Sequence, residues 1–203
     1  MNEKGIKFNC EWHEAKPLNP NDVEELIRYR DSFRRLNVIG VDKTGNCYGN
    51  VSRRISGLEF MITGSTTAYI PRIYAGHITT VKSYNLEKNT IVCEGPVRAS
   101  SESLTHAAIY QASPEVNGVI HIHSADLWDS LFNKVPTTAP GVEYGTPEMA
   151  FEFIRILRDA PSKGIVVMGG HKDGIMSFGK DLPEAANILL ESYYEIKNPR
   201  VPR

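Results

Sequence analysis

Short apolar segments with strand character alternate with amphipathic helical patterns along most of this 203-residue chain. Side chains of a strand alternate between two faces, whereas a helix repeats its apolar face every 3.6 residues. Helices are predicted over residues 22–36, 100–113, 125–132, 146–159 and 183–196, and strands over 47–63 (as a pair), 78–84, 90–94, 118–123, 164–168 and 175–178. Because strand pairs alternate with helices, the pattern favours an α/β fold with one sheet covered on both faces over a barrel or a bundle.

The charge balance bears on nucleic-acid binding, and the length bears on the number of domains. Lys plus Arg number 23 and Asp plus Glu number 24, which gives a formal net charge of −1. A nearly neutral chain lacks the basic footprint of a nucleic-acid-binding protein, so no nucleic-acid partner is expected. A chain of this length is typical of one domain, which we expect to span residues 1–203.

The cysteines and the hydropathy pattern indicate a location. Cys10, Cys47 and Cys93 are widely spaced and form no CxxC pair, which favours a reducing compartment. The first residues lack the apolar core of a signal peptide, and no apolar run approaches the ~20 residues of a membrane helix. We therefore expect a cytoplasmic protein with no membrane partner.

Two histidines two positions apart are the sharpest local signal. His121 and His123 end the β-branched run 118–123, and residues i and i+2 of a strand point to the same face. Two imidazoles placed in this way can bind one metal ion through Zn–N bonds of ~2.1 Å. The alternative is that one histidine is hydrogen-bonded in the core and the other lies at the surface.

A third metal ligand is expected from a different part of the chain. His171 lies in a glycine-rich loop, residues 168–174, between two predicted strands. Glycines in such a loop allow a close backbone approach that directs a side chain into a site. Three neutral histidines and an open coordination position are typical of catalytic rather than structural zinc, although His171 considered alone could be an ordinary loop residue.

Ser100, Ser101 and Glu102 stand at the predicted start of a helix, with one of the serines as its cap. Free N–H groups and the helix dipole make such an N-terminus suitable for an anion, and the hydroxyls add further donors. Glu102 would lie in the first turn, where helix capping by itself also accounts for an acidic residue.

Six groups of residues, taken in order, resemble the class II aldolase/adducin family. They are Gly49-Asn50-Val51-Ser52, Ile62-Thr63-Gly64-Ser65, Ser100-Ser101-Glu102, His106, His121-Ile122-His123 and His171. The group includes fuculose- and rhamnulose-phosphate aldolases, ribulose-phosphate 4-epimerase and methylthioribulose-phosphate dehydratase. The resemblance covers roughly residues 20–196.

This resemblance implies a fold and an assembly. The fold is a three-layer α/β/α sandwich built on a central, largely antiparallel mixed sheet. Family members are usually homotetramers whose active sites lie between subunits.

The resemblance also implies roles for individual residues. The metal ligands would be His121, His123 and His171, holding Zn²⁺ or another divalent ion such as Mn²⁺, Co²⁺ or Fe²⁺. Glu102 would be the catalytic acid/base and a possible resting-state ligand. A substrate phosphate or equivalent anion would be surrounded by six residues, namely Asn50, Thr63, Gly64, Ser65, Ser100 and Ser101.

The activity expected is that of a metal-dependent class II aldolase in carbohydrate metabolism. Such a lyase cleaves a carbon–carbon bond of a small hydroxyketone or ketose phosphate through a metal-stabilised enediolate, with Glu102 moving the proton. Tyr144 could donate a second proton. The loops at residues 63–67 and 170–174 depart from the usual family patterns, so the substrate stays open. The alternatives are a sugar-phosphate epimerase or dehydratase on the same scaffold, or a non-catalytic adducin-like interaction domain.

Overall fold

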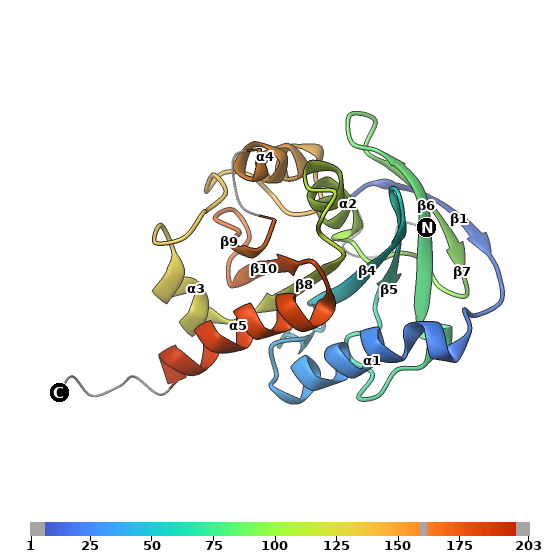
Figure 1. Cartoon of the computed structure of the whole chain (residues 1–203), viewed down its shortest axis with the longest axis horizontal. Coiled ribbons are helices and arrows are strands. Elements are labelled where there is room, and N and C mark those ends of the chain that lie inside the picture. Colours follow the sequence, from blue (N-terminus) through green and yellow to red (C-terminus); the bar gives the residue numbers. More distant parts are fainter. Residues whose placement is uncertain (1–6, 159–161, 198–203) are drawn as a thin grey trace.

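An eight-stranded sheet runs through the centre of the computed structural model, which describes residues 7–158 and 162–197 (Figure 1). Its strand order is β1-β7-β6-β5-β4-β8-β10-β9. The strands are β1 (Asn9–Glu14), β4 (Asn50–Ser56), β5 (Glu59–Thr63), β6 (Ile78–Asn85), β7 (Thr90–Gly95), β8 (Gly118–His123), β9 (Gly164–Val167) and β10 (Gly174–Gly179). Only β1 and β7 pair in parallel, so the predicted largely antiparallel mixed sheet is confirmed.

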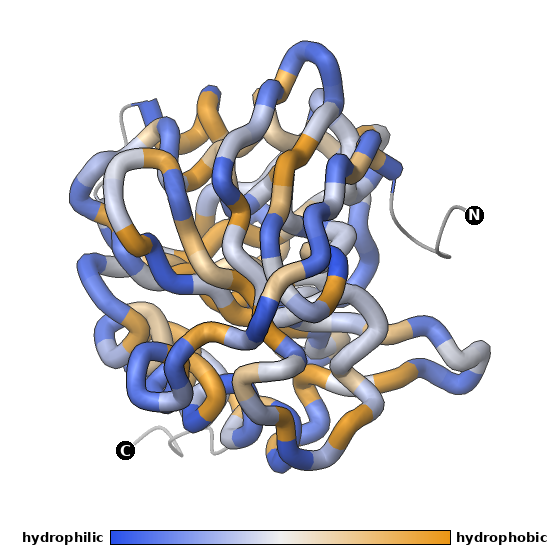
Figure 2. The backbone as a smooth tube through the Cα atoms, turned by 90° about the vertical axis from the view of Figure 1, so that its right-hand side faces the viewer, coloured by the Kyte–Doolittle hydropathy of each residue, from blue (hydrophilic) through white to orange (hydrophobic). Residues whose placement is uncertain are grey.

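Helices cover both faces of this sheet and make a three-layer sandwich (Figure 1). They are α1 (Pro20–Arg35), α2 (Ser103–Ala112), α3 (Ala125–Leu131), α4 (Pro147–Leu157) and α5 (Leu182–Lys197). Two apolar cores result, one beneath α2 and α4 and the other beneath α1, α3 and α5. Figure 2 shows hydrophilic residues at several projecting loops, with stretches of hydrophobic residues running through the body of the molecule. The predicted α/β/α architecture is therefore confirmed.

Strand β8 contributes to both cores because its side chains alternate between the faces. Val119 packs in the core with α2 and α4, whereas Ile120 and Ile122 pack in the core with α1 and α5. His121 and His123 share the parity of Val119, so they face the α2/α4 side of the sheet at the end of the strand.

Differences from the predicted elements occur at the first strands, and one predicted helix end lies outside the described residues. The predicted pair over residues 47–63 is present as β4 and β5, except that Cys47–Tyr48 form a separate strand, β3, which pairs with β2 (Gly40–Val41) in a two-stranded sheet. Strand β1 was not predicted. Helix α4 ends at Leu157, and the predicted end at Asp159 lies outside the described residues.

The predicted cap of α2 is wrong. The N-cap is Glu102, which makes no side-chain capping bond, and the helix begins at Ser103. The hydroxyl of Ser100 instead accepts a hydrogen bond from Asn50 Nδ2 at 2.9 Å, a contact with β4 that local capping rules do not include.

Within residues 7–158 and 162–197, no helix is long and apolar enough to cross a membrane.

Candidate metal and acid–base site

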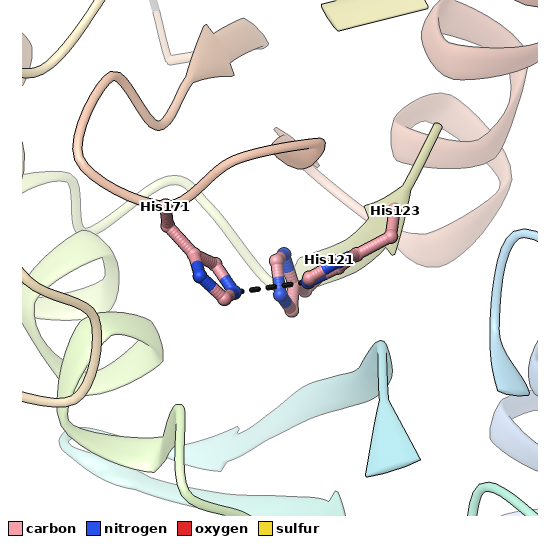
Figure 3. Close-up of side chains that lie close together, drawn as sticks. All are labelled: His121, His123 and His171. Carbon is pink, nitrogen blue, oxygen red and sulfur yellow. Dashed lines mark hydrogen bonds between the residues drawn. The ribbon is translucent and has the colours of Figure 1, made fainter. Parts of the chain in front are cut away.

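Three histidine side chains converge from two elements (Figure 3). His121 and His123 come from β8, and His171 comes from the loop between β9 and β10. One potential ligand atom from each histidine lies within 4.8 Å of the others. The Nε2 atoms of His123 and His171 are 2.9 Å apart and share a hydrogen bond. The structure thus brings together the three histidines that the sequence proposed as ligands.

The imidazoles are held in place by neighbouring groups. His121 Nδ1 lies 3.1 Å from the carbonyl oxygen of Ile175, which can accept its proton and leave Nε2 free to bind a metal. The ring of Tyr48 stacks on His123 with centroids 5.1 Å apart, and the ring of Tyr144 lies 4.4 Å from that of His171. These contacts restrict the rotation of all three rings before any ligand binds.

Burial keeps the histidines neutral. It lowers the pKa of His123 to about 4 and that of His171 to about 3, and it places the pKa of His121 well below 6.5. The neighbouring imidazoles lower the pKa values of His121 and His171 further. Neutral imidazole is the form that binds metals, so all three side chains are ready to act as ligands at neutral pH.

Two glycines permit this arrangement. A Cβ on Gly170 would lie 1.9 Å from the carbonyl oxygen of Val142, so a side chain there would push the His171 loop away from its support. Gly49 has a φ of +77°, and a Cβ on it would meet the backbone oxygen of His121 at 3.0 Å. Both positions require glycine because the backbone approaches too closely for any other residue.

The donor set fits a divalent transition metal. Two Zn–N bonds of ~2.1 Å at a tetrahedral angle place their nitrogens ~3.4 Å apart, a spacing that small rotations of the rings can reach. Three imidazole donors leave a fourth position for an oxygen of a substrate. Because imidazole also binds other first-row metals, the donor set does not select zinc among them.

Glu102 is a buried acid at the start of α2. Its Oε2 accepts a hydrogen bond from the hydroxyl of Thr105 at 2.8 Å, while its buried Oε1 has no hydrogen-bond partner among the described residues. Burial raises the pKa of Glu102 from 4.5 to about 7, against the opposing effect of the Thr105 hydrogen bond. A carboxyl group with such a pKa can both take up and release a proton near neutral pH.

A cavity of about 990 Å³ brings the candidate residues together. Its lining includes the three histidines and Glu102, and also six residues proposed for other roles, namely Asn50, Gly64, Ser65, Ser100, Ser101 and Tyr144. Asn50 pairs with His121 across β4 and β8, and its buried Oδ1 has no partner in the described part of the chain. Thr63 does not line this cavity, because its buried hydroxyl accepts a hydrogen bond from the amide of Val51 at 3.3 Å.

The sequence reasoning missed a cation beside the site. Lys7 Nζ lies 3.9 Å from the centroid of the Tyr144 ring and 2.8 Å from Glu143 Oε2. Its charge lowers the pKa values of both His171 and Glu102. The alternation of Cys10 and Trp12 with polar residues could have revealed strand β1, but no sequence pattern pointed to Lys7.

His106 supports the site from the next helical turn. Its Nδ1 lies 2.6 Å from the hydroxyl of Ser52, which also lies 2.7 Å from the hydroxyl of Tyr110. His106 is fully buried, and burial lowers its pKa from 6.5 to about 3. Its neutral form therefore contributes stability above pH 6.5 that is lost as the pH falls towards 3, on the order of 5 kcal/mol in total.

We expect His106→Asn to flatten the acid dependence of stability. As the pH falls from 6 to 4, the unfolding free energy of the native sequence should decrease by about 1.4 kcal/mol more per pH unit than that of the variant. The reason is that the native chain takes up one proton at His106 on unfolding, whereas the variant has no imidazole there to protonate. Urea unfolding followed by tryptophan fluorescence measures the slope independently of any constant loss of stability. Parallel curves for His106→Asn and the native chain would contradict the assignment.

Comparison with known proteins shows where the chain has relatives. A family model described as the Class II Aldolase and Adducin N-terminal domain matches residues 42–195. Among curated proteins, L-ribulose-5-phosphate 4-epimerase UlaF of Salmonella typhi is 29% identical over 121 residues, which cover 47% of this chain and 52% of the relative. The chain thus spans about half the length of the curated relatives it matches.

Solved structures share the same architecture. An L-fuculose 1-phosphate aldolase superposes with a TM-score of 0.66 at 22% identity, over 89% of this chain and 85% of that one. YgbL of Escherichia coli, described as a putative aldolase/epimerase/decarboxylase, also has a TM-score of 0.66, at 18% identity over 91% and 93% of the two chains. At these identities the likeness shows a common fold.

Proposed function

Because this chain belongs to the class II aldolase and adducin N-terminal domain family, we propose that it is a metal-dependent aldolase-type lyase. Its substrate would be a small hydroxyketone or a ketose phosphate, cleaved at a carbon–carbon bond next to the carbonyl group. One observation carries the proposal: three neutral histidines and a buried acid with a pKa of about 7 line the same cavity.

The metal ligands in this proposal are His121, His123 and His171. A divalent ion such as Zn²⁺, Mn²⁺, Co²⁺ or Fe²⁺ would supply Lewis-acid stabilisation of the negative charge that bond cleavage leaves on substrate oxygens. The protein's own contribution is to hold the three imidazoles neutral and directed at one point. The hydrogen bond to Ile175 fixes the tautomer of His121 for this task.

Glu102 would carry the proton. Its Oε1 has no partner among the described residues, so that oxygen is available to exchange a proton with a substrate hydroxyl or carbon. The Thr105 hydroxyl holds the other oxygen and orients the carboxyl group. Proton transfer by a positioned carboxyl group typically contributes ~10²–10⁴-fold in rate. Tyr144, which packs against His171 and lines the same cavity, is a second candidate donor.

An anionic end of the substrate would be bound by short polar side chains. Ser65, Ser100, Ser101 and the amide of Asn50 line the cavity and can donate hydrogen bonds to phosphate or carboxylate oxygens. Gly64 lines the cavity beside them, and a Cβ on it would meet Val97 Cγ2 at 2.3 Å. Thr63 would act indirectly, because its hydroxyl is bonded to the neighbouring strand.

A sugar-phosphate epimerase is the second candidate. It is supported by the match to L-ribulose-5-phosphate 4-epimerases, and the same residues could break and remake a carbon–carbon bond without releasing products. A dehydratase on this scaffold would also use the metal and Glu102. An adducin-like interaction domain would have no need of three converging histidines, and it is the weakest alternative.

The assembly and location also belong to the proposal. We expect each chain to form a single domain over residues 1–203 and four chains to form a homotetramer with active sites shared between subunits. We expect this assembly to lie in the cytoplasm. Tyr69, which lines the cavity and is 59% exposed, is the kind of side chain that a second subunit could cover.

A product assay tests the proposed activity. Protein loaded with each divalent metal in turn should release dihydroxyacetone phosphate or a free aldehyde from at least one ketose phosphate or unphosphorylated hydroxyketone. An NADH-linked assay measures these products, and NMR of the same mixtures detects an epimer or a dehydrated product instead. Stereochemical inversion without release would favour the epimerase, and no turnover in the metal-loaded screen would oppose both enzymes.

A further inference from the structure

Two cysteines that play no part in the proposed reaction lie against each other at the edge of the sheet. Cys10 of β1 and Cys93 of β7 have their sulfur atoms 3.5 Å apart. In the parallel register Cys10 stands opposite Ile91, so Cys93 is the next residue on the same face. Cys93 is fully buried, whereas Cys10 is partly exposed.

The surroundings favour a reactive pair. The hydrogen bond between the thiols lowers the pKa of Cys93 to about 7 and raises that of Cys10, so the pair holds a single proton near neutral pH. The positive charge of Arg98 lowers the pKa values of both thiols. The hydrogen bond thus favours the charge on Cys93 and leaves the shared proton on Cys10.

We propose that Cys10 and Cys93 form a peroxide-sensitive modification site, which oxidises to a disulfide and fastens strand β1 to β7. The sulfur atoms must approach from 3.5 Å to ~2.05 Å. Among the described strands, β1 lies at the edge of the sheet and pairs only with β7, so it can move by this amount without breaking hydrogen bonds to a second strand. The inference does not depend on the function proposed for the histidine cavity.

The chemistry requires one hydroperoxide per pair. The thiolate of the pair attacks one oxygen of hydrogen peroxide, breaks the O–O bond and becomes a sulfenic acid with release of hydroxide. The remaining thiol then attacks the sulfenic sulfur, forms the S–S bond and expels the sulfenic oxygen as water. In total two thiols lose two electrons and two protons, and the peroxide is reduced to two water molecules.

The full chain treated with a small excess of hydrogen peroxide tests the proposal. Titratable thiols should fall from three to one per chain, and mass spectrometry of the digest should find Cys10 linked to Cys93. The thermal midpoint Tm should rise by about 5–10 °C and return on reduction, because the bond closes a long loop of the unfolded chain.

Single substitutions supply the controls. Cys47→Ser removes the third thiol, and on peroxide treatment it should still lose two thiols and show the same rise in Tm. Cys10→Ser should show neither the intramolecular bond nor the rise in Tm. Sulfinic or sulfonic acid at Cys10 without a cross-link, a main product linked through Cys47, or three thiols still free after treatment would each overturn the proposal. A cross-link that lowers Tm would refute the fastening of β1.

Discussion

Replacing His121 or His171 with alanine is expected to abolish stoichiometric metal binding and to reduce kcat/KM by ~10³-fold or more. The Lewis acid is expected to supply several kcal/mol, and each 1.36 kcal/mol corresponds to a factor of ten in rate. His121 comes from β8 and His171 from the loop before β10. Either substitution leaves only two of the three proposed histidine ligands to hold the metal. The two readouts are the metal content per chain after dialysis, measured by mass spectrometry, and kcat/KM on the substrate that the product assay identifies.

A matched control comes from a histidine outside the cavity. His13 on β1 is exposed and its ring contacts Glu11, so His13→Ala should keep both the metal and the activity. Far-UV circular dichroism of all three variants checks that the sheet persists. Full metal occupancy in both His121→Ala and His171→Ala would rule out the three-histidine site, whatever the activity.

Glu102→Gln is expected to lower kcat by ~10²–10⁴-fold while leaving metal binding and KM within a few-fold. Glutamine matches the shape of the side chain and can still accept the hydrogen bond from Thr105, but it cannot exchange a proton. The exposed Glu148 at the start of α4 provides the control Glu148→Gln, which should retain native kcat. Undiminished kcat in Glu102→Gln would remove Glu102 from the proposed chemistry.

The same variant should be more stable than the native chain at alkaline pH. Folding raises the pKa of Glu102 from 4.5 to about 7, so the folded state favours the protonated carboxyl group. The stabilisation is present below pH 4.5 and is lost as the pH rises to about 7, at a cost of about 3 kcal/mol for the buried charge. Urea unfolding of metal-free protein at pH 8 should therefore find Glu102→Gln more stable by about this amount, with the difference vanishing near pH 4.5. Loss of activity together with a gain of stability is the mark of a residue kept for function.

Local patterns predicted the elements that carry the candidate site. The family resemblance is confirmed, and so is the sandwich on a largely antiparallel sheet. Helical and strand periods depend on neighbours a few residues apart, so they can be recognised along the chain without the fold. Strand β1 escaped prediction because it lies at the edge and is largely exposed, with polar Glu11 and His13 interrupting its apolar residues.

The errors and omissions arose where distant segments meet. Ser100 or Ser101 was predicted to cap a helix, but the N-cap is Glu102, and the Ser100 hydroxyl accepts a hydrogen bond from Asn50, which is 50 positions away along the chain. The position of Lys7 against Tyr144 depends on the pairing of β1 with β7, because Lys7 lies two residues before β1. The contact between Cys10 and Cys93 depends on the same parallel register.

The sequence by itself determined that His121 and His123 share a face, because alternation along a strand is a local property of the backbone. It also placed a histidine in a loop where glycines permit close packing. Only the tertiary structure decided that His171 meets those two histidines, and that Glu102 is buried at the same cavity with its pKa near 7. Burial and convergence are set by which strands and helices pack together, and those contacts join residues far apart in the chain.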